Sequence, residues 1–217
     1  MTTASPKRGA FISFEGGDGV GKSTQIALLA ERLRKAGREV VVTREPGGSV
    51  GAEAIRALLV TGAADRWSPL TEALLMYAAR ADHLEKIINP ARMRGAVVLS
   101  DRFSDSSMAY QGIAGALGER AIGALESLVV GADGPQLTLI LDAPVSATIA
   151  RAHARGGDHR FEAKGAAYQD RVRQAFLRIA RDSAERCAIV DASRPVDQVA
   201  ADIASLVSAR LNLFEDA

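Results

Sequence analysis

A cluster of glycines near the amino terminus is followed directly by Lys22, Ser23 and Thr24. The stretch FEGGDGVGKST fits the pattern G-x-x-x-x-G-K-[ST] from Gly16 to Ser23. Glycines let the backbone turn its amides toward one anion, and the amino terminus of a following helix adds partial positive charge. We therefore predict a nucleoside triphosphate site in which Lys22 reaches the β and γ phosphates and Ser23 ligates Mg²⁺. Its residues are Gly16, Gly17, Asp18, Gly19, Val20, Gly21, Lys22, Ser23 and Thr24.

Three arginines lie where a second anion could be held. Arg44 belongs to TREPGG at 43–48, Arg102 to SDRFSDSSMAYQG at 100–112, and Arg80 to YAAR. A single arginine is more typical of a surface charge. Arg44 and Arg102, however, each follow an apolar run, and the carboxyl ends of parallel strands meet at one edge of a sheet, so we expect the two to converge on one crevice. A guanidinium matches the paired oxygens of a phosphate, so the pair indicates phosphoryl transfer to an acceptor that is itself a phosphate.

Such an acceptor does not require a general base. Its phosphate has a second pKa of about 6, by analogy with phosphate esters, so it is largely ionised near neutral pH. Positioning and charge neutralisation can then supply most of the catalysis. The three histidines, His83, His153 and His159, do not follow the apolar runs. We expect His83 to be an exposed helix residue rather than a base.

A basic segment, RAHARGGDHRFEAKG at 151–165, contains a Gly-Gly break. Arg151 and Arg155 are one helical turn apart, and Arg160 follows the break. By itself the segment is equally typical of a solvated, charged loop. Beside a phosphate loop, we favour a lid at 151–165 that closes over the triphosphate and excludes water.

Short apolar runs alternate with helical patterns along the chain. The runs are rich in Val, Ile and Leu and are too short for core helices, which favours strands buried on both faces of a parallel sheet. Ser68 before Pro69 predicts the start of a helix, and Gly37 after Lys35 predicts the end of another. This order indicates a doubly wound α/β fold in one domain, 1–217. The five predicted strands are at 10–14, 39–43, 96–100, 137–141 and 187–191.

Composition limits the other classes of function. The 217 residues include 27 basic and 26 acidic side chains, and the net charge of +1 provides no general attraction for nucleic acid or an anionic membrane. Apolar runs do not approach the ~20 residues that span a bilayer, and MTTASPKRGA does not resemble a signal peptide, so we expect a cytoplasmic protein. Cys187, the single cysteine, is predicted to be a buried structural thiol.

The chain resembles the thymidylate kinases. FEGGDGVGKST, TREPGG, LLMYAAR, SDRFSDSSMAYQG, the arginine-rich lid and IVDAS follow the order and approximate spacing of that family, over roughly 9–207. The phosphate loop alone is not specific, whereas TREPGG, YAAR and AYQG together are. The resemblance implies the phosphate-loop nucleoside monophosphate kinase fold, with a five-stranded parallel sheet flanked by helices and a lid. It further implies ATP-dependent phosphorylation of dTMP to dTDP with Mg²⁺, and a homodimer packed through helices.

The resemblance also implies roles for individual residues. Arg102 would grip the acceptor phosphate, with Asp101 near the magnesium ion. Asp18 would contact the sugar hydroxyl of the monophosphate, and Tyr110 would pack against the deoxyribose. The side chains assigned to the acceptor pocket are Asp18, Arg44, Glu45, Met76, Arg80, Arg102, Ser107, Tyr110 and Gln111, of which Arg80 and Ser107 would face the thymine.

Two positions distinguish this chain within the family. Some members carry a catalytic arginine in the phosphate loop, where this chain has Gly19. The resemblance therefore implies that Arg155 and Arg160 of the lid supply the catalytic positive charge. Arg151 would lie against adenine. Met76 stands where the family commonly has a phenylalanine that stacks on thymine. A methionine can cover an aromatic face through its polarisable sulfur, with a less discriminating contact.

Two alternatives stay open at this point. Another small phosphate-loop kinase is the nearer one, and a nucleoside kinase would need a carboxylate base such as Glu15 or Asp101. A nucleotide-dependent switch protein is more remote, because neither Asn89 nor Asn212 belongs to an Asn-Lys-x-Asp base-reading motif.

Overall fold

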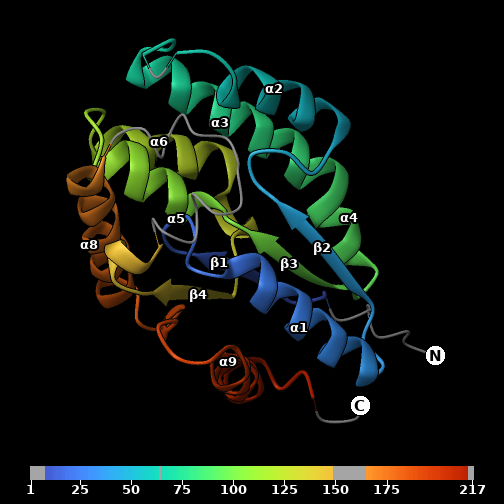
Figure 1. Cartoon of the computed structure of the whole chain (residues 1–217). Helices are drawn as coiled ribbons and strands as arrows, with labels where there is room; N and C mark the ends of the chain where they lie inside the picture. Colours follow the sequence, from blue (N-terminus) through green and yellow to red (C-terminus); the bar gives the residue numbers. More distant parts are fainter. Residues whose placement is uncertain (1–7, 64, 149–164, 215–217) are drawn as a thin grey trace.

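The computed structural model describes residues 8–63, 65–148 and 165–214. Its helices cover both faces of a central parallel sheet, so that the described chain forms three layers (Figure 1). Five strands lie in the order β2-β3-β1-β4-β5, and all their pairings are parallel. The bounds are Phe11–Glu15 for β1, Val40–Arg44 for β2, Val97–Asp101 for β3, Leu137–Asp142 for β4 and Cys187–Asp191 for β5.

The predicted strands are therefore confirmed, although four of them extend one residue further toward the carboxyl end than the apolar runs do. The additional residues are Glu15, Arg44, Asp101 and Asp142. These polar residues mark the edge of the sheet at which the chain leaves each strand. In the register of the sheet, Phe14 lies opposite Asp101. The neighbouring strands β1 and β3 therefore end side by side at this edge.

The helices follow the strands as the alternating pattern predicts. Helix α3 begins at Pro69, and the Ser68 side chain accepts a hydrogen bond from Thr71 N as its amino-terminal cap. Helix α1 ends at Lys35, two residues before Gly37, which has a φ of 75°. The helical bounds are α1 Lys22–Lys35, α2 Val50–Val60, α3 Pro69–His83, α4 Asn89–Met93, α5 Ser104–Ser107, α6 Glu119–Val129, α8 Ala166–Asp182 and α9 Val196–Leu211, with π-helical turns η1 Leu84–Ile88 and η2 Met108–Ile113 and a 3-10 turn η3 Gly131–Asp133.

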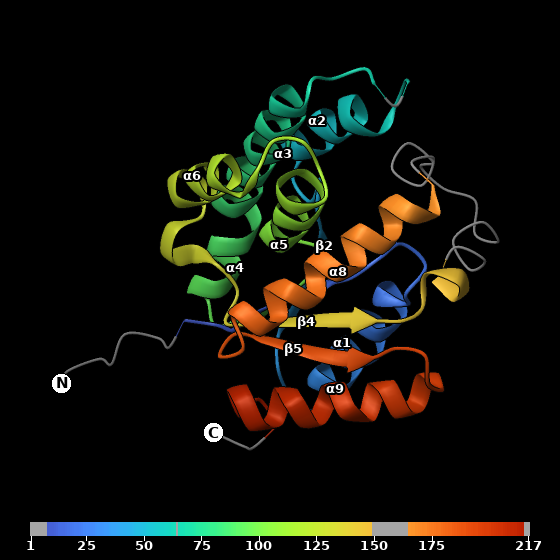
Figure 2. The same cartoon turned by 90° about the vertical axis from the view of Figure 1, so that its left-hand side faces the viewer.

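Apolar side chains fill both faces of the sheet. On one face, α1 and α9 pack against β1, β4 and β5 through residues such as Ile26, Leu33 and Ile203. The other face is covered by α3, α4 and α6 beside β3, and by η2 and α8 beside β4 and β5. Figure 2 shows α9 and α8 on opposite sides of β4 and β5. Strands β1, β3 and β4 are buried on both faces, which explains their continuous apolar runs. The edge strands β2 and β5 are only partly buried, with Val42 and Ile189 each 48 % exposed, so the prediction of burial on both faces is wrong for these two.

Helix α2 lies outside these layers and packs on α3 (Figure 1). Cys187 is buried and forms no disulfide, in agreement with the prediction, and burial raises the pKa of its thiol to about 12. Such a thiol is a poor nucleophile. Across the described ranges, no helix combines the length and the apolar character that crossing a membrane requires.

Candidate active site

The phosphate loop joins β1 to α1 and has the strand-loop-helix context that its sequence requires. Gly16 and Gly21 have φ values of 124° and 105°, a region that side chains rarely adopt. At Gly16 space is limiting as well, since a Cβ atom there would lie 2.3 Å from the carbonyl oxygen of Leu141. Gly21 caps the amino terminus of α1. The loop backbone therefore presents the positive end of the helix to a bound anion.

Lys22 folds back along this loop. Its Nζ donates to the carbonyl oxygens of Gly16 and Gly17 at 3.2 and 3.1 Å. Burial lowers the pKa of the ammonium group, and the positive charge of Arg102 lowers it further. A buried cation held by neutral carbonyls is suited to exchange these partners for anionic phosphate oxygens.

Ser23 and Asp101 bring oxygen atoms together at the carboxyl edge of the sheet. The Ser23 hydroxyl donates to Asp101 Oδ2 at 2.9 Å. Within the described ranges, His, Cys, Asp and Glu form no group of three that could hold a metal by themselves. One hydroxyl and one carboxylate nevertheless fit Mg²⁺, which keeps several waters and takes further oxygens from substrate phosphates.

A cavity opens beside the phosphate loop, between the ends of β2 and β3 and the helices that follow them. It encloses about 720 Å³, including space open to solvent. The lining residues are Asp18, Glu45, Pro46, Arg56, Val60, Met76, Arg80, Arg102, Phe103, Ser106, Ser107, Tyr110 and Gln111.

Arg102 is the cation of this cavity nearest the phosphate loop. It follows β3 directly and, although not a glycine, has a φ of 70°. Its Nη2 donates to Asp18 Oδ1 at 2.7 Å and to the Tyr110 hydroxyl at 3.2 Å, and its Nη1 donates to Ser106 Oγ at 2.9 Å. Asp18 belongs to the phosphate loop, so Arg102 connects the loop to the cavity.

Arg80 is held by a buried cluster at the other side of the cavity. Its Nε donates to Glu45 Oε2 at 2.7 Å, and its Nη2 donates to Ser107 Oγ at 3.1 Å. His83 Nδ1 lies 3.0 Å from the second oxygen of Glu45, and His83 Nε2 lies 2.7 Å from Thr43 Oγ1. Arg80 Nη1 is buried and has no hydrogen-bond partner among the described residues.

The prediction that His83 is exposed is wrong. Its side chain is 0 % exposed, because Glu45 and Thr43 come from β2 and the loop after it and satisfy both ring nitrogens. A helical pattern alone does not reveal partners that lie about 40 residues away in the chain. His83 is also not a base for the acceptor, since it lies behind Glu45 rather than in the cavity lining.

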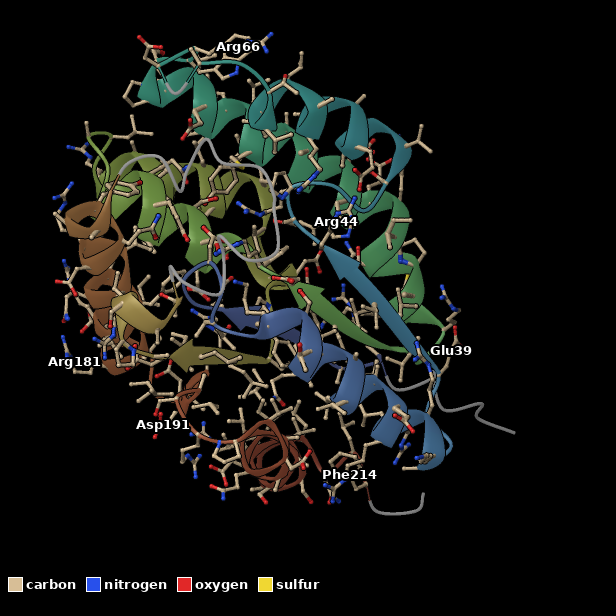
Figure 3. All side chains as sticks on the ribbon, in the orientation of Figure 1. Glu39, Arg44, Arg66, Arg181, Asp191 and Phe214 are labelled. Carbon is tan, nitrogen blue, oxygen red and sulfur yellow. The ribbon has the colours of Figure 1, made fainter. Side chains whose placement is uncertain are left out.

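Arg44 does not join Arg102 in the lining of this cavity. It is the last residue of the edge strand β2, and its Nη2 lies 3.1 Å from Glu53 Oε1 on α2. Its side chain is 57 % exposed. Figure 3 shows Arg44 at the end of β2 opposite to Glu39. The two arginines leave the same edge of the sheet, since Arg44 lies opposite Asp101 in the register, but the Arg44 side chain contacts Glu53 and does not line the cavity.

The remaining residues predicted for the acceptor pocket do line the cavity. Met76 lies in its wall, as does Tyr110, whose pKa burial raises. Gln111 is buried and donates to Glu72 Oε1 at 2.9 Å. Arg151, Arg155 and Arg160, with most of the predicted lid, lie outside the described residues.

Five lining residues were missed in the sequence. Arg56 and Val60 are four residues apart on α2, and Arg56 Nη1 donates to the Pro46 carbonyl oxygen at 2.8 Å. No motif marked that helix. Phe103 and Pro46 are direct neighbours of predicted residues, and Ser106 lies in the same motif as Ser107, so proximity to the motifs was the available signal.

Glu15, one of the two carboxylates considered as a base, is 0 % exposed and does not line the cavity. Phe103 N and Ser106 Oγ donate to its two oxygens. A base must reach the proton that it removes, so this position argues against a nucleoside kinase that uses Glu15.

Comparisons with known proteins agree with this geometry. A family model described as "Thymidylate kinase" matches residues 14–203. The thymidylate kinase of Caulobacter vibrioides is 59 % identical over 206 residues, which cover 95 % of this chain and 99 % of the relative. The thymidylate kinase of Ruegeria pomeroyi is 49 % identical over 94 % of this chain and 97 % of its own length. The crystal structure of thymidylate kinase from Ehrlichia chaffeensis matches with a TM-score of 0.77 at 32 % identity, covering 92 % of this chain and 99 % of that chain.

Proposed function

This chain belongs to the thymidylate kinase family and phosphorylates dTMP with ATP as co-substrate, and we propose that it does so by in-line transfer between two nucleotides held end to end in one cleft. The supporting observation is the bond from Arg102 to Asp18, which places the cationic end of the acceptor cavity against the phosphate loop. A phosphate of dTMP bound by Arg102 would then face a triphosphate bound by the loop amides. Little covalent chemistry is left for the protein beyond positioning and charge stabilisation.

In this proposal the phosphate loop holds the donor. The loop amides bind the phosphate oxygens, and Lys22 exchanges its bonds to Gly16 and Gly17 for the β and γ phosphates. Ser23 and Asp101 hold the cation, as their hydroxyl and carboxylate oxygens suggest. Mg²⁺ bound by these two residues would supply positive charge that neutralises the phosphates.

The cavity holds the acceptor. Arg102 binds the phosphate of dTMP, Asp18 binds the sugar hydroxyl, and Tyr110 packs against the deoxyribose. Arg80 donates to the thymine edge, and Ser107 and Met76 contact the same base, as their places in the cavity lining suggest. Glu45 orients Arg80, and Gln111 completes the wall. Arg44 contacts Glu53 and does not line the cavity, so we propose that it supports the loop after β2 rather than binding dTMP directly.

The charge that develops during transfer needs further cations. Gly19 occupies the position within the loop where some family members carry an arginine, so we assign this charge to Arg155 and Arg160 of the lid. Arg151 would lie against adenine. An arginine that reaches the transferred group in phosphoryl-transfer enzymes raises the rate by about 10³ to 10⁵.

A homodimer is also part of the proposal. Contiguous exposed apolar surface marks sites of association, and helices α2, α3 and α6 pack side by side and carry exposed Val50, Leu58, Leu70, Leu74 and Leu128. Sedimentation of the wild-type protein should give twice the chain mass, and Leu74→Glu should give the monomer. Met93→Glu, which changes an exposed residue on α4, is the matched control.

A cytoplasmic location and a single domain stay predictions.

The acceptor assignment is tested by a coupled assay of ATP turnover with purified protein. Turnover should depend on dTMP and saturate with it. Clear stimulation by dGMP, dCMP or shikimate, without stimulation by dTMP, would overturn the acceptor while leaving the fold intact. Calorimetric titration should also show that thymidine binds much more weakly than dTMP, because a site built around Arg102 loses its ion pair when the phosphate is removed.

A further inference from the structure

Arg102 is held in an uncommon backbone conformation. Its φ of 70° lies in the left-handed region, which is unfavourable for a side chain with a Cβ atom and persists where the surroundings fix it. Arg102 N donates to Phe14 O at 2.9 Å, and Ser100 Oγ donates to Arg102 O at 2.7 Å. The next amide, Phe103 N, donates to Glu15 Oε1 at 2.7 Å. The turn after β3 is therefore fastened on both sides of Arg102.

The second oxygen of Glu15 reaches the guanidinium group through a serine. Ser106 Oγ accepts a hydrogen bond from Arg102 Nη1 at 2.9 Å and donates one to Glu15 Oε2 at 2.6 Å. When Glu15 is ionised, the hydroxyl lies between a cation and a carboxylate and is polarised by both, which strengthens each bond. One carboxylate thus fixes both the main chain and the side chain of the same arginine.

The reaction itself leaves Glu15 without a role. The side chain is fully buried at the end of β1 and does not reach the cavity, so it neither binds substrate nor removes a proton. Burial raises the pKa of Glu15, the negative charge of Asp105 raises it further, and the positive charge of Arg102 lowers it. Placing a carboxyl group in such a position is costly unless its oxygens are satisfied. Both oxygens are satisfied by the turn that carries Arg102.

We propose that Glu15 and Ser106 are positioning residues for the acceptor phosphate: Ser106 lines the cavity beside Arg102 and fixes the direction of its guanidinium, and Glu15 fixes Ser106 from the buried side. The proposal rests on the proposed role of Arg102. Of the contacts made by Arg102, those with Asp18 and Tyr110 lie among residues assigned to dTMP, whereas the chain through Ser106 ends in the buried Glu15.

The test compares dTMP with thymidine, which lacks the phosphate. Calorimetric titration of the full chain should show Ser106→Ala binding dTMP about tenfold more weakly, as expected for a lost hydrogen bond to a charged group, with the affinity for thymidine changed by less than about twofold. Ser104→Ala is the matched control. Its hydroxyl is buried in the same turn but donates to Glu126 on α6, so both affinities should stay as in the wild type.

Glu15→Gln provides a second variant of similar shape. Titrated above the raised pKa of Glu15, which is about 8, the wild-type carboxylate accepts from both donors whereas the amide can accept from only one, so dTMP binding should weaken while thymidine binding does not. Equal losses for both ligands, or a loss in Ser104→Ala as large as in Ser106→Ala, would show a general structural role and overturn the proposal. Unchanged dTMP binding in Ser106→Ala would overturn it as well. Arg102→Ala, measured in parallel, distinguishes failure of the positioning role from failure of the phosphate site. If Arg102→Ala alone loses dTMP affinity, the positioning role fails and the phosphate site stands.

Discussion

The hydroxyl of Ser23 lies 2.9 Å from Oδ2 of Asp101, although 78 positions separate the two residues in the chain. One opens α1 and the other ends β3, and the pairing of β1 with β3 brings them together. The oxygen pair links the donor loop to the strand that carries Arg102.

This pair should determine how the enzyme uses magnesium. We expect Ser23→Ala and Asp101→Asn each to raise the Mg²⁺ concentration that gives half-maximal turnover, because the first removes a ligand oxygen and the second removes the negative charge that attracts the ion. Turnover measured over a range of Mg²⁺ at saturating ATP and dTMP checks this. Asp191→Asn, at the end of β5 on the edge of the sheet, serves as control. An unchanged Mg²⁺ dependence in both variants would contradict the site.

Lys22→Ala should remove turnover while leaving the fold and dTMP binding intact. Loss of one preorganised charge that stabilises the transition state lowers kcat by about 10²-fold or more. The loop conformation depends on glycine dihedral angles rather than on this side chain, so circular dichroism and dTMP affinity should match the wild type. Retention of full activity would refute the role of Lys22 at the triphosphate.

Met76→Phe should tighten the binding of dTMP. Met76 lines the cavity, and a ring stacked on thymine contributes about 0.5 to 1.5 kcal/mol, or about two- to twelvefold in affinity. Titrations with dTMP and dUMP would show whether the gain includes better discrimination. No change for either nucleotide would mean that residue 76 does not contact the base.

Breaking the buried pair of Arg80 and Glu45 should destabilise the fold. Both side chains are almost fully buried, at 2 % and 4 % exposure, so Glu45→Gln leaves the Arg80 cation without its counter-charge. Removal of one partner from a buried ion pair costs about 3 to 5 kcal/mol. Urea unfolding measures the difference, with Glu53→Gln, which alters the exposed pair with Arg44, as control. Equal stability of the two variants would contradict this reasoning.

Glu15 should make stability fall as the pH rises. Burial raises its pKa in the folded chain from 4.5 to about 8, with Asp105 adding to the shift. Between these two values the folded chain keeps a proton that the unfolded chain has released, so the free energy of unfolding decreases with increasing pH. The difference in that free energy between wild type and Glu15→Gln should follow the same trend from pH 5 to pH 8. A difference that is constant with pH would exclude the raised pKa.

The sheet and the phosphate loop could be predicted because each is encoded locally. Continuous Val, Ile and Leu runs specify strands buried on both faces, and the Gly16–Ser23 pattern specifies the loop between one strand and the next helix. The acceptor pocket was identified through motifs on three segments, and Asp18, Arg80 and Arg102 all line it.

What the sequence did not reveal depends on packing between distant segments. His83 lies three residues after Arg80 on α3, but its burial follows from Thr43 and Glu45. Arg44 ends a strand, as expected, yet Glu53 on a helix outside the recognised motifs holds it away from the cavity. Arg56 and Val60 belong to that same helix and carried no signal of their own.

The central position of β1 and β3 in the sheet has a consequence for the evolution of substrate choice. Both segments that we propose to bind phosphate are anchored to one backbone ladder, with Phe14 opposite Asp101, whereas Met76 and Arg80, which we propose to face the base, come from α3. Exchange of a wall residue such as Met76 can alter which nucleobase is accepted without moving the two reacting groups relative to each other. Changes in α3, which carries Met76 and Arg80, therefore offer a route to new base specificities while β1 and β3 stay fixed.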